Sequence, residues 1–526
     1  MNESPFDYQP IAHSTWAYLS SLLMLALFFK FNRFWSVRNF DLVLIILLAP
    51  GILLVDYGLK LEKSLPFNLA TASETQPTQG AGSETDESQP SGKAPGPSQE
   101  SNSQVLPKPE GAEDASDAAP GDPEKIMQDA KRSRQLERGQ WSQRYGYIWL
   151  FSIGALIMLR MLLDPILVRR PVLLPNLSIG ALIFLGCSLL TFLVVNIITV
   201  GVSEDDMSGA RSAVKMLQRE TAEQSETAQL QRHGPGFPLF HLFPVIPTFD
   251  TGEQLLKTDA DRPQNDPKYR AAAKSLAIIG QTALILGLIL FGFYHFNNFA
   301  IGVGMATIYL MLPYTTLFTG AVLHVLPGAL LVWAIVCFRK PWMAGIFIGL
   351  ATGVSYYPLF LLPLWISFYW ENGVKRFVAG VVIALSVCIG GLLMTSSDLS
   401  HFGSQLQATF GFWLPMMDGL EGIWGLGWSR SYRLPILVAF FLFCISFVFW
   451  PIRKNLGTLI AYTCAIMIGV QFWHGFGGGL FMAWYLPTAL MIIFRPAMEG
   501  RVASVELRNY RKAKALETPE DLLPAP

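Results

Sequence analysis

The chain has 526 residues, of which 51% are hydrophobic and only 15% are charged. Its 39 basic and 39 acidic residues cancel, which argues against a nucleic-acid partner, because nucleic-acid-binding proteins carry a basic surplus. The apolar residues are grouped in blocks, and many blocks approach the roughly 20 residues that cross a bilayer core of about 30 Å. These features predict an all-α, polytopic membrane helix bundle.

Two apolar blocks, near 17–29 and 42–55, predict two spans in the N-terminal segment 1–63. No basic region precedes the first block and no small-residue cleavage site follows it, so we expect a span rather than a signal peptide. Residues 64–142 are rich in Ser, Pro, Gly and Glu, a composition typical of a disordered linker. Inside that linker, the mixed charge of 123–143 favours a juxtamembrane helix.

The segment 143–200 contains two further apolar blocks, near 147–163 and 174–200, which predict the third and fourth spans. Two acids lie at the ends of predicted spans, Asp56 and Asp164. We expect both side chains to be exposed and to have no catalytic role.

The polar segment 201–272 follows, as a loop outside the membrane. It opens with three consecutive acids, Glu204–Asp206, and continues into an amphipathic helix predicted over 208–220. Further on, the glycines and prolines of 233–248 predict a rigid loop pressed onto the membrane surface and exclude a regular helix.

The segment 273–495 is expected to form the main membrane helix bundle, followed by a basic tail over 496–526. Several of its apolar blocks are short, which fits tilted or re-entrant helices. With the four earlier spans they give about thirteen, at 273–294, 299–319, 322–337, 342–353, 357–370, 377–394, 433–450, 456–472 and 479–494.

Basic residues predict the orientation, because short cytoplasmic loops carry an excess of Lys and Arg. Alternate loops are basic, and so is the tail, which places the N-terminus outside and the C-terminus inside. The acidic motif, the 233–241 segment, the 395–432 loop and the 473–478 turn then lie together on the outer face. The polar chemistry is therefore predicted on one side of the membrane.

Three of these features resemble the GT-C glycosyltransferases over residues 174–495. An acidic motif follows a span, a Gly-Pro-aromatic stretch lies at 234–240, and Leu312–Gly320 leads to a Gly/Ala-rich helix at 342–353. The bacterial mannosyl- and arabinofuranosyltransferases that use polyprenyl-phosphate sugars are the most similar group. The chain departs from them at 354–357, where many carry Lys or Arg and this sequence reads Val-Ser-Tyr-Tyr.

The resemblance implies a multi-pass enzyme of a bacterial inner membrane. It would move a hexose or pentose from a lipid-linked donor to a glycan or lipid acceptor. Asp205 or Asp206, with Glu204 beside them, would be the general base for the acceptor hydroxyl. Adjacent acids also suit a divalent metal ion, and no other cofactor is indicated. The alternative interpretation is that the three acids cap the following helix.

A polyprenyl phosphate needs cationic donors, and Arg430 and Arg433 lie at the outer mouth of a predicted span. His324 and His474, at the outer ends of spans, and His401, in an interfacial segment, are candidates for binding sugar, phosphate or lipid tail. Arginines and histidines also anchor helix ends at the membrane interface, which is the alternative for the first four; the alternative for the segment of His401 is that it simply covers the bundle. The cysteines include no pair with metal-binding spacing, and His233 and His241 lack a third ligand for zinc.

Two other functions are compatible with the same composition and the same pattern of apolar blocks. A transporter places charged residues deep in its spans, and we find few such charges here. A catalytically silent partner in polysaccharide assembly is the third hypothesis, because a fold does not determine a function.

Overall fold

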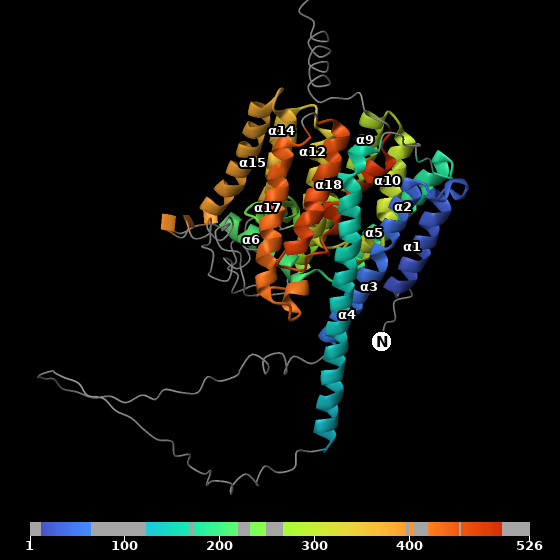
Figure 1. Ribbon diagram of the computed structural model, residues 1–526. Coiled ribbons are helices and arrows are strands. Elements are labelled where there is room, and N and C mark those ends of the chain that lie inside the picture. Colours follow the sequence, from blue (N-terminus) through green and yellow to red (C-terminus); the bar gives the residue numbers. More distant parts are fainter. Residues whose placement is uncertain are drawn as a thin grey trace, which may run out of the picture. The chain divides into compact units, whose positions relative to one another are not determined.

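A computed structural model describes the chain in eleven stretches. Within them every regular element is a helix, which confirms the all-α class (Figure 1). Most of the predicted linker and tail, at 65–122 and 497–526, lies outside the described residues. The stretches are 12–64, 123–167, 173, 175–218, 232–248, 267–395, 399–400, 402–403, 406, 419–451 and 454–496.

The chain divides into two compact units. Unit 1 comprises residues 1–56 and 143–526, and unit 2 comprises residues 57–142. The helices α3 (Leu48–Lys63) and α4 (Pro123–Leu162) each contribute to both units.

Six helical stretches among the described residues are long and apolar enough to cross a membrane, as a membrane protein requires. Shorter apolar helices of 10 to 17 residues accompany them. A total of about thirteen spans therefore stays a prediction. The six stretches are Val37–Lys63, Ala130–Ile166, Ile179–Thr199, Pro267–Phe296, Val374–Leu393 and Leu456–Trp473.

In the N-terminal half, α4 begins at Pro123, so the mixed-charge segment is helical as predicted. Within unit 1, α3 and α4 approach closely, because a Cβ at Gly146 would lie 2.9 Å from the carbonyl oxygen of Gly51. Small residues commonly allow such close contact between membrane helices. The other early elements are α1 (His13–Phe28), η1 (Phe31–Arg33), α2 (Val37–Ile46), η3 (Asp164–Ile166) and α5 (Ile179–Thr199).

The polar segment after α5 contains two helices, α6 (Glu204–Gln218) and α8 (Phe237–Thr248). The expectation that prolines exclude a helix over α8 is wrong. Pro244 and Pro247 interrupt only the second half of this short helix, and packing against α6 and α9 (Pro267–Phe296) stabilises it. The apolar face of α6 is buried in the same cluster. Its members are Ala210, Ala213, Val214, Leu242, Val245, Tyr269 and Ala272.

The remaining helices build a bundle in which α18 is central: every residue of α18 except Phe472 is buried. In the same unit, α15 lies at one edge and α1 at the opposite edge (Figure 1). The helices are α10 (Phe299–Met311), α11 (Pro313–Leu317), α12 (Val322–Val336), α13 (Pro341–Val354), α14 (Leu362–Tyr369), α15 (Val374–Thr395), α17 (Arg433–Phe449), α18 (Leu456–Trp473) and α19 (Leu486–Phe494). Short 3₁₀ turns connect some of them: η5 (Tyr357–Leu361), η6 (Gly422–Gly425), η7 (Arg430–Tyr432) and η8 (Met482–Trp484).

The helices α13 and α15 pack more closely than side chains would normally allow. Gly345, Gly349 and Gly353 recur every fourth residue along one stripe of α13. A Cβ at Gly345 would meet the carbonyl oxygen of Phe377, and a Cβ at Gly353 would meet Cys388. This glycine stripe sets the position of the C-terminus of α13, where the candidate site is built.

Candidate functional site

The acidic motif forms the first turn of α6, so the predicted helix begins at Glu204 rather than at residue 208. The hydroxyl of Ser203 accepts a hydrogen bond from the Asp206 backbone N–H (3.2 Å) and donates one to Asp206 Oδ2 (2.7 Å). The Ser203 hydroxyl is therefore the N-cap acceptor of α6, and the three acids lie in the first turn, where negative charge is favourable.

Asp206 also joins α6 to the bundle. Its side chain is buried, and Oδ1 accepts a hydrogen bond from the backbone N–H of Val322 (3.2 Å), the first residue of α12. Burial raises the pKa of Asp206 to about 7, against the opposing effect of its two hydrogen bonds. Both carboxylate oxygens are thus held by the protein.

Asp205 has a different environment, with 49% of its side chain exposed. Its Oδ1 lies 3.7 Å from Arg232 Nη1 and 4.0 Å from His233 Nε2. The other end of the Arg232 guanidinium donates to Glu421 Oε1 at 2.5 Å, and its Cζ lies 5.1 Å from the centre of the Phe476 ring. Arg232 therefore links the acidic motif to two later loops.

Backbone hydrogen bonds hold these loops in place. Gly234 N–H donates to Val354 O (2.8 Å) and Gly236 N–H donates to Gly353 O (2.7 Å), which fixes the loop on the C-terminus of α13. Glu421 N–H donates to Gly475 O (2.8 Å). The acidic motif, the 232–236 loop, the 419–425 turn and the 474–479 turn therefore meet at one end of unit 1, called the acid end below.

Two predicted histidines lie at the acid end within a continuous series of ring contacts. The ring of Phe481 separates them, at 4.3 Å from His324 and 4.5 Å from His474. His324 shares a 3.0 Å hydrogen bond with the Tyr314 hydroxyl, and His474 Nδ1 accepts one from Phe476 N–H (3.1 Å). We call this series the ring stack; its members are Phe318, His324, Phe481, His474, Tyr357 and Tyr356.

Arg433 lies beside the ring stack at the start of α17. It is buried, its Nε donates to Trp473 O (2.7 Å), and its Cζ lies 6.0 Å from the centre of the Trp473 ring. The Trp473 ring also contacts Tyr357 of the 354–357 stretch, which has no cation of its own, at a centroid distance of 5.3 Å. This arrangement joins Arg433 to His474 through Tyr357, whose ring centre is 4.4 Å from that of His474.

The other predicted site residues are not brought into this arrangement. Glu204 is exposed and pairs with Arg211 (2.9 Å). His401 and the side chain of Arg430 lie outside the described residues. The sequence analysis missed Arg232 and Glu421, because their significance depends on contacts between loops far apart in the chain. In the described stretches, no group of three or more His, Cys, Asp or Glu is arranged to hold a metal ion.

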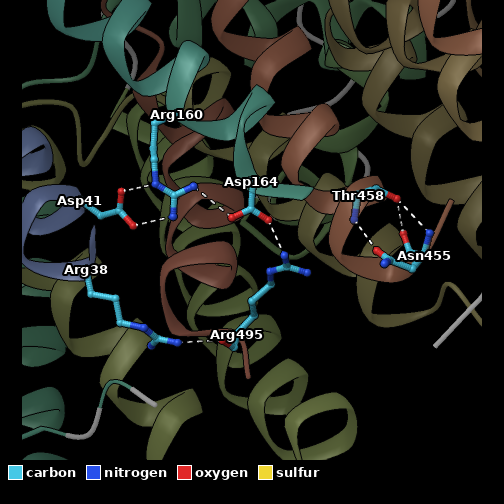
Figure 2. Close-up of polar contacts among 7 residues, drawn as sticks. All are labelled: Arg38, Asp41, Arg160, Asp164, Asn455, Thr458 and Arg495. Atoms are coloured by element: carbon cyan, nitrogen blue, oxygen red, sulfur yellow. Dashed lines mark hydrogen bonds and ion pairs between the residues drawn. The ribbon is translucent and has the colours of Figure 1, made fainter. Parts of the chain in front are cut away.

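A second polar cluster lies elsewhere in unit 1 (Figure 2). Arg160 makes a bidentate ion pair with Asp41 (2.7 and 2.9 Å) and a third contact with Asp164 (3.0 Å). Asp164 also pairs with Arg495 (2.6 Å), and Arg38 donates to the Arg495 carbonyl (3.0 Å). We call these five residues the buried ion network. The expectation that Asp164 is exposed is wrong: the residue is fully buried and pairs with Arg160 and Arg495.

The buried ion network and the acid end lie at opposite ends of α18. The guanidinium of Arg495 lies against Gly457, in the first turn of α18, which an Asn455–Thr458 capping box begins (Figure 2). Trp473 and His474, at its other end, belong to the acid end. At a rise of 1.5 Å per residue, the 18 residues of α18 separate the two sites by roughly 27 Å.

No protein-family model matches this sequence, and no curated protein is significantly similar to it.

Proposed function

We propose that the chain is a membrane glycosyltransferase that moves a sugar from a polyprenyl-phosphate donor to an envelope glycan or lipid acceptor. The observation that carries the proposal is the meeting of Asp205, Arg232 and the ring stack with Arg433 at the acid end. A half-exposed acid, cations and stacked rings are the groups that such a transfer needs. We place the acid end on the outer face of a bacterial inner membrane.

Asp205 is the better candidate for the base. A general base must reach the acceptor hydroxyl, and Asp206 is buried with both oxygens engaged. In the proposed step the acceptor oxygen attacks the anomeric carbon, and the bond from that carbon to the phosphate oxygen breaks. The polyprenyl phosphate leaves with the bonding electrons, and the hydroxyl proton passes to Asp205.

Because its side chain is buried, Arg433 is assigned a longer-range electrostatic role toward the leaving phosphate rather than a direct contact. Arg433 is fixed through its Nε on Trp473 O, and its Cζ lies 6.0 Å from the centre of the Trp473 ring. A fixed guanidinium stabilises developing phosphate charge without reorganising during the reaction.

The test is transfer from radiolabelled polyprenyl-phosphate mannose, glucose and arabinose by purified protein in nanodiscs. Wild type should transfer one of these sugars and Asp205→Asn should not. Asp206→Asn should keep much of the activity, because an amide oxygen still accepts the Val322 N–H. Absence of transfer from the whole panel, with native unfolding behaviour, contradicts the proposal.

A transporter is the second candidate, and the buried ion network favours it. Charged side chains enclosed between membrane helices commonly mark ion or substrate paths. Asp41 and Arg160 lie within the helical stretches that are long enough to span a membrane. The test is proton-coupled or solute flux into proteoliposomes. Flux in wild type that is lost in Asp41→Asn supports this alternative, and absence of flux in wild type rejects it.

A further inference from the structure

His233 is a buried histidine with no role in the step described above. Only 4% of the residue is exposed, and its ring stacks on Phe237 with a centroid distance of 4.5 Å. Neither ring nitrogen has a hydrogen-bond partner among the described residues. Buried polar groups are nearly always hydrogen-bonded, so an imidazole left in this state calls for a functional explanation.

The ring nitrogen Nε2 points to the acidic motif. It lies 4.0 Å from Asp205 Oδ1, a little beyond a hydrogen bond. Arg232, the preceding residue, approaches the same oxygen at 3.7 Å, and its other nitrogen holds Glu421. Two groups therefore approach the same carboxylate oxygen of Asp205: the partly exposed guanidinium of Arg232 and the buried imidazole of His233.

The backbone around His233 is firmly placed. Gly234 and Gly236 hydrogen-bond to the C-terminus of α13, and a Cβ at Gly234 would collide with the Gly353 carbonyl. Burial lowers the pKa of His233 to about 4, so the ring is neutral near pH 7 and carries one N–H donor. The charged and titratable groups around it are Asp205, Arg232 and His241.

We infer that His233 is a positioning residue for Asp205. Its Nε2–H donates to Asp205 Oδ1 when substrate is bound, which leaves Oδ2 free to take the acceptor proton. The inference rests on the proposed role of Asp205 as the base. Hydrogen bonds of catalytic groups are often long in the unliganded enzyme and shorten in the substrate complex, which accounts for the 4.0 Å separation.

Three variants test this role by sugar-transfer kinetics in nanodiscs. His233→Phe keeps the stack on Phe237 but removes the donor, and His233→Gln restores an N–H near the position of Nε2. His241→Phe is the matched control, because His241 also packs on Phe237 (4.6 Å) and bonds its carbonyl through Nδ1 (3.0 Å).

His233→Phe should lower kcat by up to about 100-fold with little change in the donor KM, as expected when a base is misplaced by about 1 Å. His233→Gln should recover most of this loss, and His241→Phe should behave like wild type. Equal losses in the two Phe variants, or no recovery in His233→Gln, indicate a purely structural role and overturn the inference.

A second measurement needs no activity. In protein labelled with ¹⁵N-histidine, Asp205→Asn removes the carboxylate that lies 4.0 Å from His233 Nε2, so even without substrate it should shift this resonance and leave that of His241 in place. If wild type transfers no sugar, the proposed function fails while this measurement still tests the contact between the two side chains. An unchanged His233 resonance in Asp205→Asn overturns the inference whatever the activity.

Discussion

Asp205 and Asp206 are neighbours in the sequence, yet their surroundings give them different chemistry. Asp206 is enclosed and bonded to Ser203 and Val322, while Asp205 is half exposed beside Arg232. Sequence spacing predicted that the acids form either a catalytic motif or a helix cap. In the structure both oxygens of Asp206 are engaged, by Ser203 and Val322, whereas the side chain of Asp205 is half exposed.

The stability of the fold should report the environment of Asp206. Its pKa is about 7 in the folded chain and 3.8 in a model peptide, so between these values the folded state holds a proton that the unfolded state has lost. The contribution of Asp206 to stability is therefore complete below pH 4 and disappears as the pH rises through 7. Relative to Asp206→Asn, the Tm of wild type should fall between pH 5 and pH 8. Parallel Tm curves for the two proteins contradict this assignment.

At the scale of elements, the acid end depends on close contact between the 232–236 loop and α13. The glycines at 234 and 236 make this contact possible, because their N–H groups reach carbonyl oxygens at the last turn of the helix. The same contact positions Arg232 and His233 beside Asp205. The sequence marked the loop as rigid, but did not show what holds it.

Gly234→Ala should separate the loop from α13. The new methyl group meets the Gly353 carbonyl, so the loop must move and two hydrogen bonds weaken. We expect a loss of about 1–3 kcal/mol in the free energy of unfolding, together with reduced transfer. Gly201→Ala is the matched control, since nothing lies within 4 Å of a Cβ there. If the two variants unfold alike in thermal denaturation, the contact is unimportant for stability.

At the scale of unit 1, α18 connects two polar sites, the acid end and the buried ion network. The C-terminus of α18 belongs to the acid end, and its first turn contacts Arg495 of the buried ion network. Through Asp41 and Arg160, that network ties α2 and α4 to the end of α19. The N-terminal spans are therefore part of the folded core of unit 1.

Arg160→Met should test how strongly the network holds these helices. The substitution removes the bidentate ion pair with Asp41 and one of the contacts of Asp164. Breaking a buried ion pair in this way costs about 3–5 kcal/mol, whereas an exposed pair contributes about 0–1 kcal/mol. Arg211→Met, which removes the exposed pair with Glu204 (2.9 Å), is the matched control. Equal unfolding temperatures for the two variants contradict a stabilising network.

The helical class and most helix bounds could be predicted from the sequence because hydropathy is a local property. The grouping of the acidic motif with the 473–478 turn followed from counting loops. The Arg232–Glu421 and Arg160–Asp41 pairs could not be predicted, because each joins residues more than 100 positions apart. The helix α8 was missed because tertiary packing outweighs the local preference of Pro244 and Pro247.

The most direct test of the account is the rate of sugar transfer by wild type, Asp205→Asn and Glu204→Gln under saturating donor. Loss of a general base should lower kcat by about 100-fold or more in Asp205→Asn. Glu204→Gln, which changes the more exposed neighbouring acid that pairs with Arg211, should keep the wild-type rate. A wild-type rate in Asp205→Asn contradicts the central claim that Asp205 is the base at the acid end.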